Sequence, residues 1–361
     1  MTGGSRPVRL LVGSYTEPRP NRRIAGKGVA LLRLHPDSGA LETLDLLGGL
    51  PNPAYLRPHR ETVAHVACEE DAGAAGIATV GIDGDRLALL ARAAVPGDAP
   101  CHLDVHPGGR WLATACYGSG HVCVHPLDAG GQAGEPVAVV QHHGAGTHPV
   151  RQAGPHAHAT RFSPDGRWLL AADLGTDEVW CHPFDAATGL LGPAPRRWRA
   201  PAGSGPRLLL FARDGRHVVL VNELANTVAS LRWENGALSP VAAHPTLLRP
   251  HGGANTASGL RWHPSGTGFA ASNRGAESIA LFGFDPATGA VEPVSETPAG
   301  CAKPRDFDFS PCGRWLVVCG QDSDELAVLA VDPARLSLLD TGIRHRMDTP
   351  SCLRFLPEGT P

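Results

Sequence analysis

The sequence predicts an all-β protein: a seven-bladed β-propeller, with four-stranded antiparallel blades, that forms a single domain over residues 1–361. Three observations predict this fold. One turn recurs about every 50 residues, apolar residues alternate in front of each turn, and the two ends of the chain complement each other. A period of this length, repeated this often, is typical of propellers and solenoids.

The recurring turn is clearest at residues 163–167, which read SPDGR. With Pro164 as the reference position, related segments follow one another at spacings of 46 to 57 residues. The reference positions are Pro58, Pro107, Pro164, Arg213, Pro264, Pro311 and Pro357. Seven such turns indicate seven copies of one structural unit.

A short strand precedes each turn. The residues two and four positions before the reference are mostly apolar, and this period of two predicts a strand. The position between them is often charged, as in Asp104, Arg161, Arg261, Asp308 and Arg354. After the turn, runs such as WLLAA and EVWCHPF predict a second and a third strand, and a weaker fourth one follows. Four strands in about 50 residues make one propeller blade.

The last blade is expected to contain both ends of the chain. Almost no sequence follows the seventh turn, which reads Pro357-Glu358-Gly359, whereas the N-terminal run RLLVGSYT resembles a second strand without a first. Joining the two closes the ring and hides the edges of the blades. The widest spacing between turns marks an insertion at residues 129–154, which is expected to be a loop over one face.

Composition excludes several classes of protein. A formal net charge of −3 does not suit a nucleic-acid-binding or polybasic membrane protein, and no window is apolar enough to span a membrane. The N-terminal run has no signal-peptide pattern, so a cytoplasmic location is expected. The nine cysteines form no CxxC motif, which indicates reduced, buried thiols.

Residues that carry chemistry stand out as departures from the repeat. Six positions before the reference, the repeats read Asn52, Cys101, His158, Arg207, Ser258, Arg305 and Ser351. Nine to ten positions after it, the polar residues are Tyr117, Asp173, Asn222, Glu223, Asn273, Arg274 and Gln321. Strand order in a propeller places both sets near one mouth of the central channel. There, arginines would bind an anionic molecule through their planar donor fork.

The motif PHAH places His156 and His158 on one strand face. This spacing is compatible with a metal site, a structural histidine, or a catalytic or substrate-binding histidine. The last is preferred, because no ligand pair stands in a neighbouring repeat and arginines already supply positive charge. No metal and no cofactor are therefore expected. The chain has no GxSxG motif, no P-loop and no GxGxxG before a helix, so serine-nucleophile, nucleotide and nicotinamide sites lack support.

Several segments resemble a known family. They are LLVGSYT, RQAGPHAHATRFSPDGRWLLAADLGTDEV, GPRLLLFARDGRHVVLVNEL, SNRGAESIALF and KPRDFDFSPCGRWLVV. Together they are similar to the bacterial 6-phosphogluconolactonase family of seven-bladed propellers, whose relatives include fungal 3-carboxy-cis,cis-muconate lactonizing enzyme. The resemblance extends from about Val8 to Phe355. It implies a metal-independent lactonase or a lactone-forming enzyme whose site comprises His158 (or, less favoured, His156), Arg207, Glu223 and Arg274.

The favoured function is hydrolysis of a lactone that carries a phosphate or carboxylate. Arg207 and Arg274, with Arg305, would hold the anion and polarise the ester carbonyl, and Glu223 or His158 would act as the general base. Glu223 is expected to be ionised because arginines surround it. The expected substrate-binding residues are His156, Arg305, Asp173, Asn222, Asn273, Gln321, Tyr117 and Arg151. The alternatives are lactonization of a muconate-type carboxylate and a non-catalytic propeller that binds partners.

Overall fold

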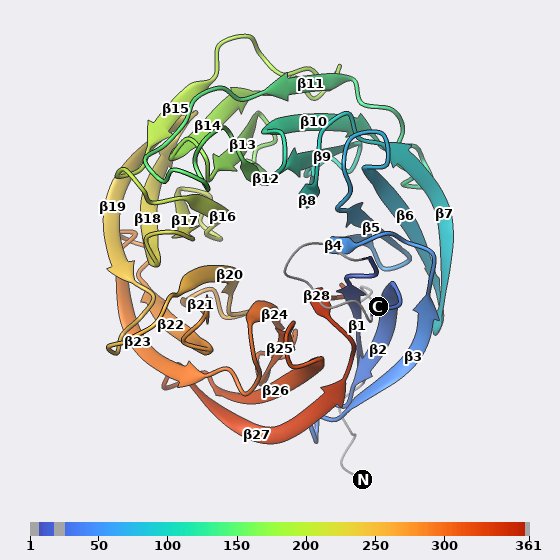
Figure 1. The fold of residues 1–361 in the computed structure, drawn as a ribbon, viewed down its shortest axis with the longest axis vertical. Helices are drawn as coiled ribbons and strands as arrows, with labels where there is room; N and C mark the ends of the chain where they lie inside the picture. The colour runs from blue at the N-terminus through green and yellow to red at the C-terminus, as the bar shows by residue number, and fades with distance from the viewer. Residues whose placement is uncertain (1–6, 18–25, 358–361) are drawn as a thin grey trace.

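A computed structural model of the chain describes residues 7–17 and 26–357. Its 28 strands form seven four-stranded antiparallel sheets, and the described residues contain no helix. Figure 1 shows the sheets arranged as blades around a central axis. The predicted seven-bladed propeller is therefore confirmed. The prediction of one domain covers residues outside the described ranges, Glu358 and Gly359 of the seventh turn among them, and stays a prediction.

Each blade runs from an innermost strand at the channel to an outermost strand at the rim. The innermost strands are β4 (Pro53–Arg60), β8 (Pro100–Val105), β12 (Ala157–Phe162), β16 (Pro206–Phe211), β20 (Thr256–Trp262), β24 (Pro304–Phe309) and β28 (Pro350–Phe355). The second strands are β1 (Val8–Ser14), β5 (Val63–Cys68), β9 (Trp111–Cys116), β13 (Trp168–Asp173), β17 (His217–Asn222), β21 (Gly268–Arg274) and β25 (Trp315–Gly320).

The two outer positions of each blade complete the sheets. The third strands are β2 (Val29–Leu34), β6 (Gly76–Asp83), β10 (His121–Pro126), β14 (Glu178–Pro183), β18 (Thr227–Glu234), β22 (Ser278–Phe284) and β26 (Glu325–Asp332). The outermost strands are β3 (Leu41–Leu47), β7 (Arg86–Ala94), β11 (Ala138–Gln141), β15 (Arg196–Arg199), β19 (Ala237–Pro245), β23 (Val291–Pro298) and β27 (Ser337–Arg346).

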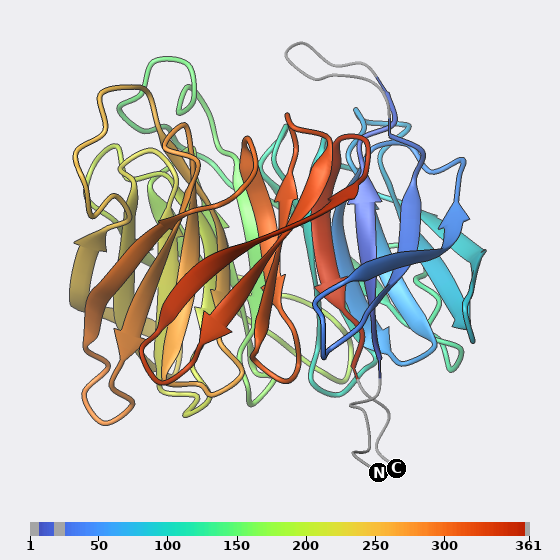
Figure 2. The same cartoon turned by 90° about the horizontal axis from the view of Figure 1, so that it is seen from below.

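The ring closes as the sequence predicts. β28, near the C-terminal end, pairs with β1 in an antiparallel register that sets Val12 opposite Leu353. Figure 1 shows these two strands, one red and one blue, side by side in the same blade. Figure 2 shows the ring from its edge, with the strands running between its two faces. Closure completes the seventh blade, whose innermost strand β28 packs between β24 and β4 of the neighbouring blades.

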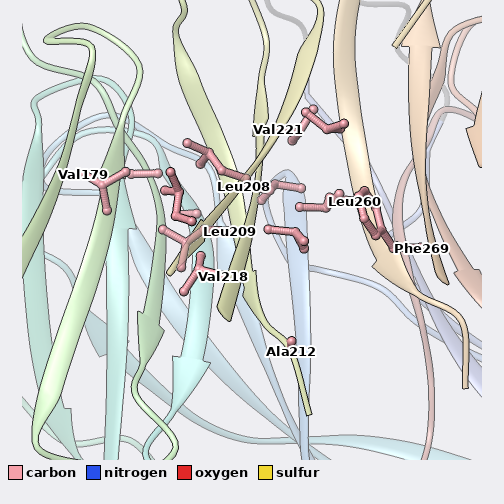
Figure 3. Packing of buried hydrophobic residues seen from close by; sticks show 14 of the residues in the cluster. Val179, Leu208, Leu209, Ala212, Val218, Val221, Leu260 and Phe269 are labelled. Atoms are coloured by element: carbon pink, nitrogen blue, oxygen red, sulfur yellow. The ribbon is translucent and has the colours of Figure 1, made fainter. Parts of the chain in front are cut away.

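Apolar side chains fill the spaces between blades. Leu209 of β16 and Leu260 of β20 belong to one buried cluster, together with Phe269 of β21 and Val179 of β14, and Figure 3 shows how they pack between neighbouring sheets. Burying a side chain of this size stabilises the fold by about 1.5–3 kcal/mol. The two apolar positions of each innermost strand thus pack between blades. The often charged residue that separates them in the sequence is left to face the channel.

The innermost strands share a β-bulge that the sequence pattern does not reveal. In β12, Ala157 pairs with Asp173 and Ala159 pairs with Ala172, so that His158 has no residue opposite it. The same bulge leaves one residue unpaired in five other blades, namely Ala54, Cys101, Arg207, Arg305 and Ser351. In β20 it comprises two residues, Ser258 and Gly259. A bulge re-aims a side chain, which brings these residues to the channel.

The pairing corrects the alignment of the first repeat. Pro53 pairs with Cys68 and Tyr55 with Ala67, so that Ala54, not Asn52, is the equivalent of His158. The reference position of this blade is accordingly residue 60 rather than residue 58. The cause is the turn, because β4 extends to Arg60 and only two residues separate it from β5.

The insertion at residues 129–154 is only partly a loop. Four of its residues form the outermost strand β11, which pairs with β10. Residues 129–137 lead out to β11, and residues 142–154 lead back from it to the start of β12. In the ranges that the structure covers, no helix is long and apolar enough to cross a membrane.

Candidate active site

The innermost strands all run in the same direction along the channel. We call the end where they begin the upper mouth and the end where they finish the lower mouth. The bulged residues lie near the upper mouth, because the bulge is at the start of each innermost strand. Next to them is a second ring of residues, one per blade, at the end of the second strand. This ring comprises Tyr15, Glu69, Tyr117, Leu174, Glu223, Arg274 and Gln321.

Glu223 is the centre of a charged cluster at the upper mouth. Its Oε1 accepts a hydrogen bond from Arg151 Nη2 at 2.5 Å, and its Oε2 accepts one from Arg207 Nε at 2.7 Å. Arg274 Nη2 is 3.0 Å from Oε2, and His158 Nε2 is 3.9 Å from the same oxygen. The structure therefore brings together all four residues predicted to be catalytic, and Arg151 with them.

Burial and charge set the protonation states of this cluster. Burial raises the pKa of Glu223, but Arg274, Arg207, His158 and Arg151 outweigh it and hold that pKa well below its ordinary value. Burial, helped by Arg207, holds the pKa of His158 well below 6.5. At neutral pH the cluster thus contains a carboxylate, three guanidinium groups and a neutral imidazole.

The insertion positions Arg151 over the cluster. Its neighbour Gln152 is fully buried and fixes the loop, because its Oε1 accepts from the backbone N–H of Thr147 and its Nε2 donates to Asp177. Arg151 Nε also donates to the Tyr117 hydroxyl at 3.0 Å. Because the loop is anchored, the backbone of Arg151 is already ordered, and only its side chain loses freedom when it contacts Glu223.

The predicted residues Tyr117 and His156 form one wall of the upper mouth. Their rings stack with centroids 4.5 Å apart and planes 14° apart, and His156 Nδ1 is 2.6 Å from the Tyr117 carbonyl oxygen. The Tyr117 ring also meets His158 edge-on, with centroids 5.4 Å apart. His156 thus belongs to this wall and contacts Tyr117 rather than Glu223.

Arg305 belongs to a second group at the same mouth. Its Nη2 is 3.9 Å from Glu69 Oε2, and its guanidinium carbon is 5.2 Å from the centre of the Tyr15 ring. The Tyr15 hydroxyl donates to Glu69 at 2.9 Å. Sequence reasoning missed Glu69, which is the counterpart of Glu223 in its blade, because the misplaced reference in the first repeat hid it.

Two predicted binding residues form hydrogen bonds within the protein instead of facing the cluster. Asp173 is fully buried, with Oδ2 2.8 Å from His142 Nδ1 and Oδ1 accepting from the backbone N–H groups of His156, Gly175 and Thr176. Asn273 is also fully buried and exchanges hydrogen bonds with Thr246. Both hold loops in place, and a role in binding stays a prediction for each.

Asn222 and Gln321 use only part of the hydrogen-bonding capacity of their side chains. Asn222 Nδ2 donates to Thr227 Oγ1 at 3.0 Å, and Gln321 Nε2 donates to Asp322 at 3.3 Å. The side-chain oxygen of each is buried with no hydrogen-bond partner among the residues the structure describes. Substrate binding by these two residues stays a prediction.

A small cavity of about 20 Å³ next to the cluster is lined by bulged residues that include Cys101, His158 and Arg207. Cys101 Sγ is 3.3 Å from the His158 carbonyl oxygen, and burial raises the pKa of this thiol to about 12. Cys101 is thus a neutral thiol at physiological pH. Within residues 7–17 and 26–357, no three His, Cys, Asp or Glu side chains are grouped so as to hold a metal ion.

The fold and the upper mouth define a class: seven-bladed propellers with a cluster of arginine, glutamate and histidine in the channel. Residues 9–355 match the family model described as "Lactonase, 7-bladed beta-propeller", so the chain belongs to this lactonase family. The resemblance predicted from sequence motifs is confirmed.

Three relatives show how close the similarity is. The 6-phosphogluconolactonase of Bacillus subtilis is 28% identical over 354 residues, which are 96% of this chain and 97% of the relative. Among solved structures, the periplasmic gluconolactonase of Pseudomonas aeruginosa is 31% identical with a TM-score of 0.89, over 98% of this chain and 99% of that one. A putative 6-phosphogluconolactonase from Bacteroides fragilis is 28% identical, also with a TM-score of 0.89, over 97% and 98% of the two chains. Because one relative is named as periplasmic, the cytoplasmic location stays a prediction.

Proposed function

We propose that the upper mouth hydrolyses a lactone that carries a phosphate or carboxylate, without a metal ion. The observation that carries the proposal is the Glu223 cluster. Three guanidinium groups, those of Arg151, Arg207 and Arg274, surround one carboxylate, which leaves a formal charge of +2. Such an excess, largely out of water, attracts an anion strongly. The names of the relatives, which include both gluconolactonases and 6-phosphogluconolactonases, support a sugar lactone.

The arginines have two tasks in this reaction. One guanidinium binds the phosphate or carboxylate of the substrate through its planar donor fork. Another points donors at the ester carbonyl, whose oxygen becomes an oxyanion when water attacks, and donors placed in advance stabilise that charge. Arg207 and Arg274 contact the same Glu223 oxygen as His158, and therefore suit the carbonyl. Arg305, held beside Glu69, suits the far end of the substrate.

His158 is the general base in this proposal, rather than Glu223. Both oxygens of Glu223 are occupied by arginines, and its lowered pKa makes it a weak proton acceptor. His158 is neutral, and its Nε2 is next to the cluster. A bound anion would raise the pKa of His158 and make it a better base. Glu223 then serves to hold the arginines and to attract the imidazolium that forms.

The reaction proceeds in two steps. His158 removes a proton from water as the water oxygen bonds to the lactone carbonyl carbon, giving a tetrahedral oxyanion. The carbon–oxygen bond of the ring then breaks, and the ring oxygen takes the proton from the imidazolium. The product is the open-chain hydroxy acid, and His158 is neutral again.

Steady-state hydrolysis by the purified protein tests this proposal, with 6-phosphogluconolactone and unphosphorylated gluconolactone as matched substrates. We expect kcat/KM to be at least about tenfold higher for the phosphorylated lactone, since one charge-assisted contact contributes about 1.5–3 kcal/mol, and we expect EDTA to have no effect. Equal rates for the two lactones would contradict the anionic substrate, and loss of activity with EDTA would contradict metal independence. Conversion of a carboxymuconate without lactone hydrolysis would establish the lactonizing alternative, and binding without turnover the non-catalytic one.

A further inference from the structure

The lower mouth of the channel carries a second cluster of arginines that hydrolysis at the upper mouth does not use. It lies near the ends of the innermost strands, at the charged position that the sequence repeat singles out. With the first repeat realigned, Arg57 joins this ring. Its charged members are Arg57, Asp104, Arg161, Arg261, Asp308 and Arg354. The arginines line a cavity of about 480 Å³ at this mouth, within the range typical of small-molecule sites.

Two buried aspartates are each shared by two of these arginines. Asp104 Oδ1 is 3.0 Å from Arg57 Nη2 and 2.9 Å from Arg161 Nη1. Asp306, which follows the bulge of β24, is 2.8 Å from Arg261 Nη2. Its other oxygen is 2.6 Å from Arg354 Nη1. Each aspartate thus joins arginines of different blades.

These ion pairs leave several buried guanidinium donors unused. The Nε of Arg57, Arg161 and Arg261 and the Nη2 of Arg354 have no hydrogen-bond partner among the described residues. Arg261 and Arg354 are only 7% and 8% exposed, and both line the cavity. Buried polar groups in folded proteins are nearly always hydrogen-bonded, and four unpartnered donors on arginines that line one cavity depart from that rule.

The charge of the lower mouth favours an anionic acceptor. Four guanidinium groups face three carboxylates, those of Asp104, Asp306 and Asp308, so the formal charge is +1 when all are ionised. Burial raises the pKa of Asp308 to about 7, so that the charge is more positive still near neutral pH. Asp308 forms no ion pair within 4.0 Å in the described ranges, and its oxygens accept from the backbone N–H groups of Phe309 and Phe355.

We propose that the lower mouth is a second binding site, for a small oxyanion such as phosphate or the carboxylate of a sugar acid. The site is separate from the upper mouth, because none of the residues that line its cavity belongs to the Glu223 cluster. A ligand therefore enters from the lower face. The proposal does not depend on the reaction at the upper mouth.

A structural network is the competing explanation. The same ion pairs would then only tie neighbouring blades together, and adding an anion would have no effect. The two explanations differ in what they predict for Arg57 and Arg161. If the lower mouth binds an anion, replacing these two side chains weakens that binding; if the ion pairs are only structural, it does not.

Calorimetry and crystal soaks with sodium phosphate distinguish them, with sodium gluconate as the carboxylate arm. We expect density for the anion at the lower mouth, in contact with Arg261 and Arg354. In solution, the double variant Arg57→Gln/Arg161→Gln should raise the Kd for the better anion about tenfold or more. The better of the two anions identifies the ligand chemistry. The variant should keep the lactone kcat/KM, so that failure of this proposal and failure at the upper mouth are distinguishable.

The matched control is Arg167→Gln, which removes the same charge from an exposed turn beside the lower mouth. It should leave the Kd unchanged. If the double variant does not fold, Arg57→Lys/Arg161→Lys keeps the charge, removes the Nε donors and should still weaken binding. Density at the upper mouth alone, or the same Kd in variant and control, would overturn the proposal. A variant that melts at a lower temperature yet binds the anions as the wild type does would establish the structural network.

Discussion

The two mouths of the channel are both rich in arginine, but they use it differently. At the upper mouth Arg151, Arg207 and Arg274 converge on the single carboxylate of Glu223, and a neutral histidine touches the same group. At the lower mouth the carboxylates outnumber those of that cluster, and two of them are each shared between blades. The difference separates a site with excess positive charge beside a proton acceptor from a ring of arginines whose charge buried carboxylates partly neutralise.

The origin of the carboxylates explains this difference. Glu223 follows the second strand of its blade, so it reaches the channel from a connecting loop. Asp104, Asp306 and Asp308 belong to innermost strands, and their positions follow from the sheets themselves. Loops vary more readily among homologues than strands do, so Glu223 and Arg151 are the parts of the upper site most open to change, whereas the carboxylates of the lower mouth belong to the scaffold.

The largest expected effect comes from removing the proton acceptor of the upper mouth. His158→Asn should lower kcat for the lactone by about 10²–10⁴-fold, the usual contribution of a general base, with little change in KM. The control is His156→Asn, because His156 contacts the Tyr117 carbonyl oxygen rather than Glu223. Full kcat in His158→Asn would transfer the role of base to Glu223.

A comparable effect, on stability rather than on rate, is expected at the lower mouth. Asp306→Ala leaves two buried guanidinium groups without their carboxylate and should lower the free energy of unfolding by about 3–5 kcal/mol. Asp165→Ala, which breaks an exposed ion pair with Arg167, should cost about 0–1 kcal/mol. Urea denaturation measures both. Similar losses of unfolding free energy in the two variants would mean that the ion pairs of Asp306 are not effectively buried.

The smallest expected effect concerns the pH profile of kcat/KM for the lactone, which should show no decline near pH 6.5. A general base works only when unprotonated, and the lowered pKa of His158 moves its protonation to lower pH. The kcat/KM for the lactone should therefore stay level as pH falls from 8 through 6.5, and decline only well below that value. A profile that bends at pH 6.5 or above would mean that His158 is not held neutral in the free enzyme.

The repeat predicted the fold because alternation and turn spacing are local features. Leu209 and Leu260 occupy the places between blades that their period of two requires. The charged cluster was also predictable, since His158, Arg207, Glu223 and Arg274 all depart from the repeat at matched positions. Here the unusual residues of different blades meet because the ring aligns equivalent positions around one axis.

Two features escaped prediction for physical reasons. The bulge at His158 is defined by the pairing of β12 with β13, in which Ala157 and Ala159 are opposite the consecutive residues Asp173 and Ala172. The short turn after β4 moved the first repeat by two residues, which concealed both Glu69 and the place of Arg57 in the lower ring. One signal of the bulge was available in the sequence. The bulged residues and the charged ring are three positions apart, and two residues three apart cannot share a face of a regular strand.

Matched substitutions at the two mouths test the central claim, that the upper mouth is the site of hydrolysis. Arg274→Gln and Arg161→Gln each remove one guanidinium from an acid–arginine cluster, the first at the upper mouth and the second at the lower mouth. The kcat/KM for the preferred lactone should fall at least about tenfold in Arg274→Gln, through loss of a charge-assisted contact, and stay within about twofold of wild type in Arg161→Gln. An equal fall in both variants, or a fall in Arg161→Gln alone, would contradict the assignment of catalysis to the upper mouth.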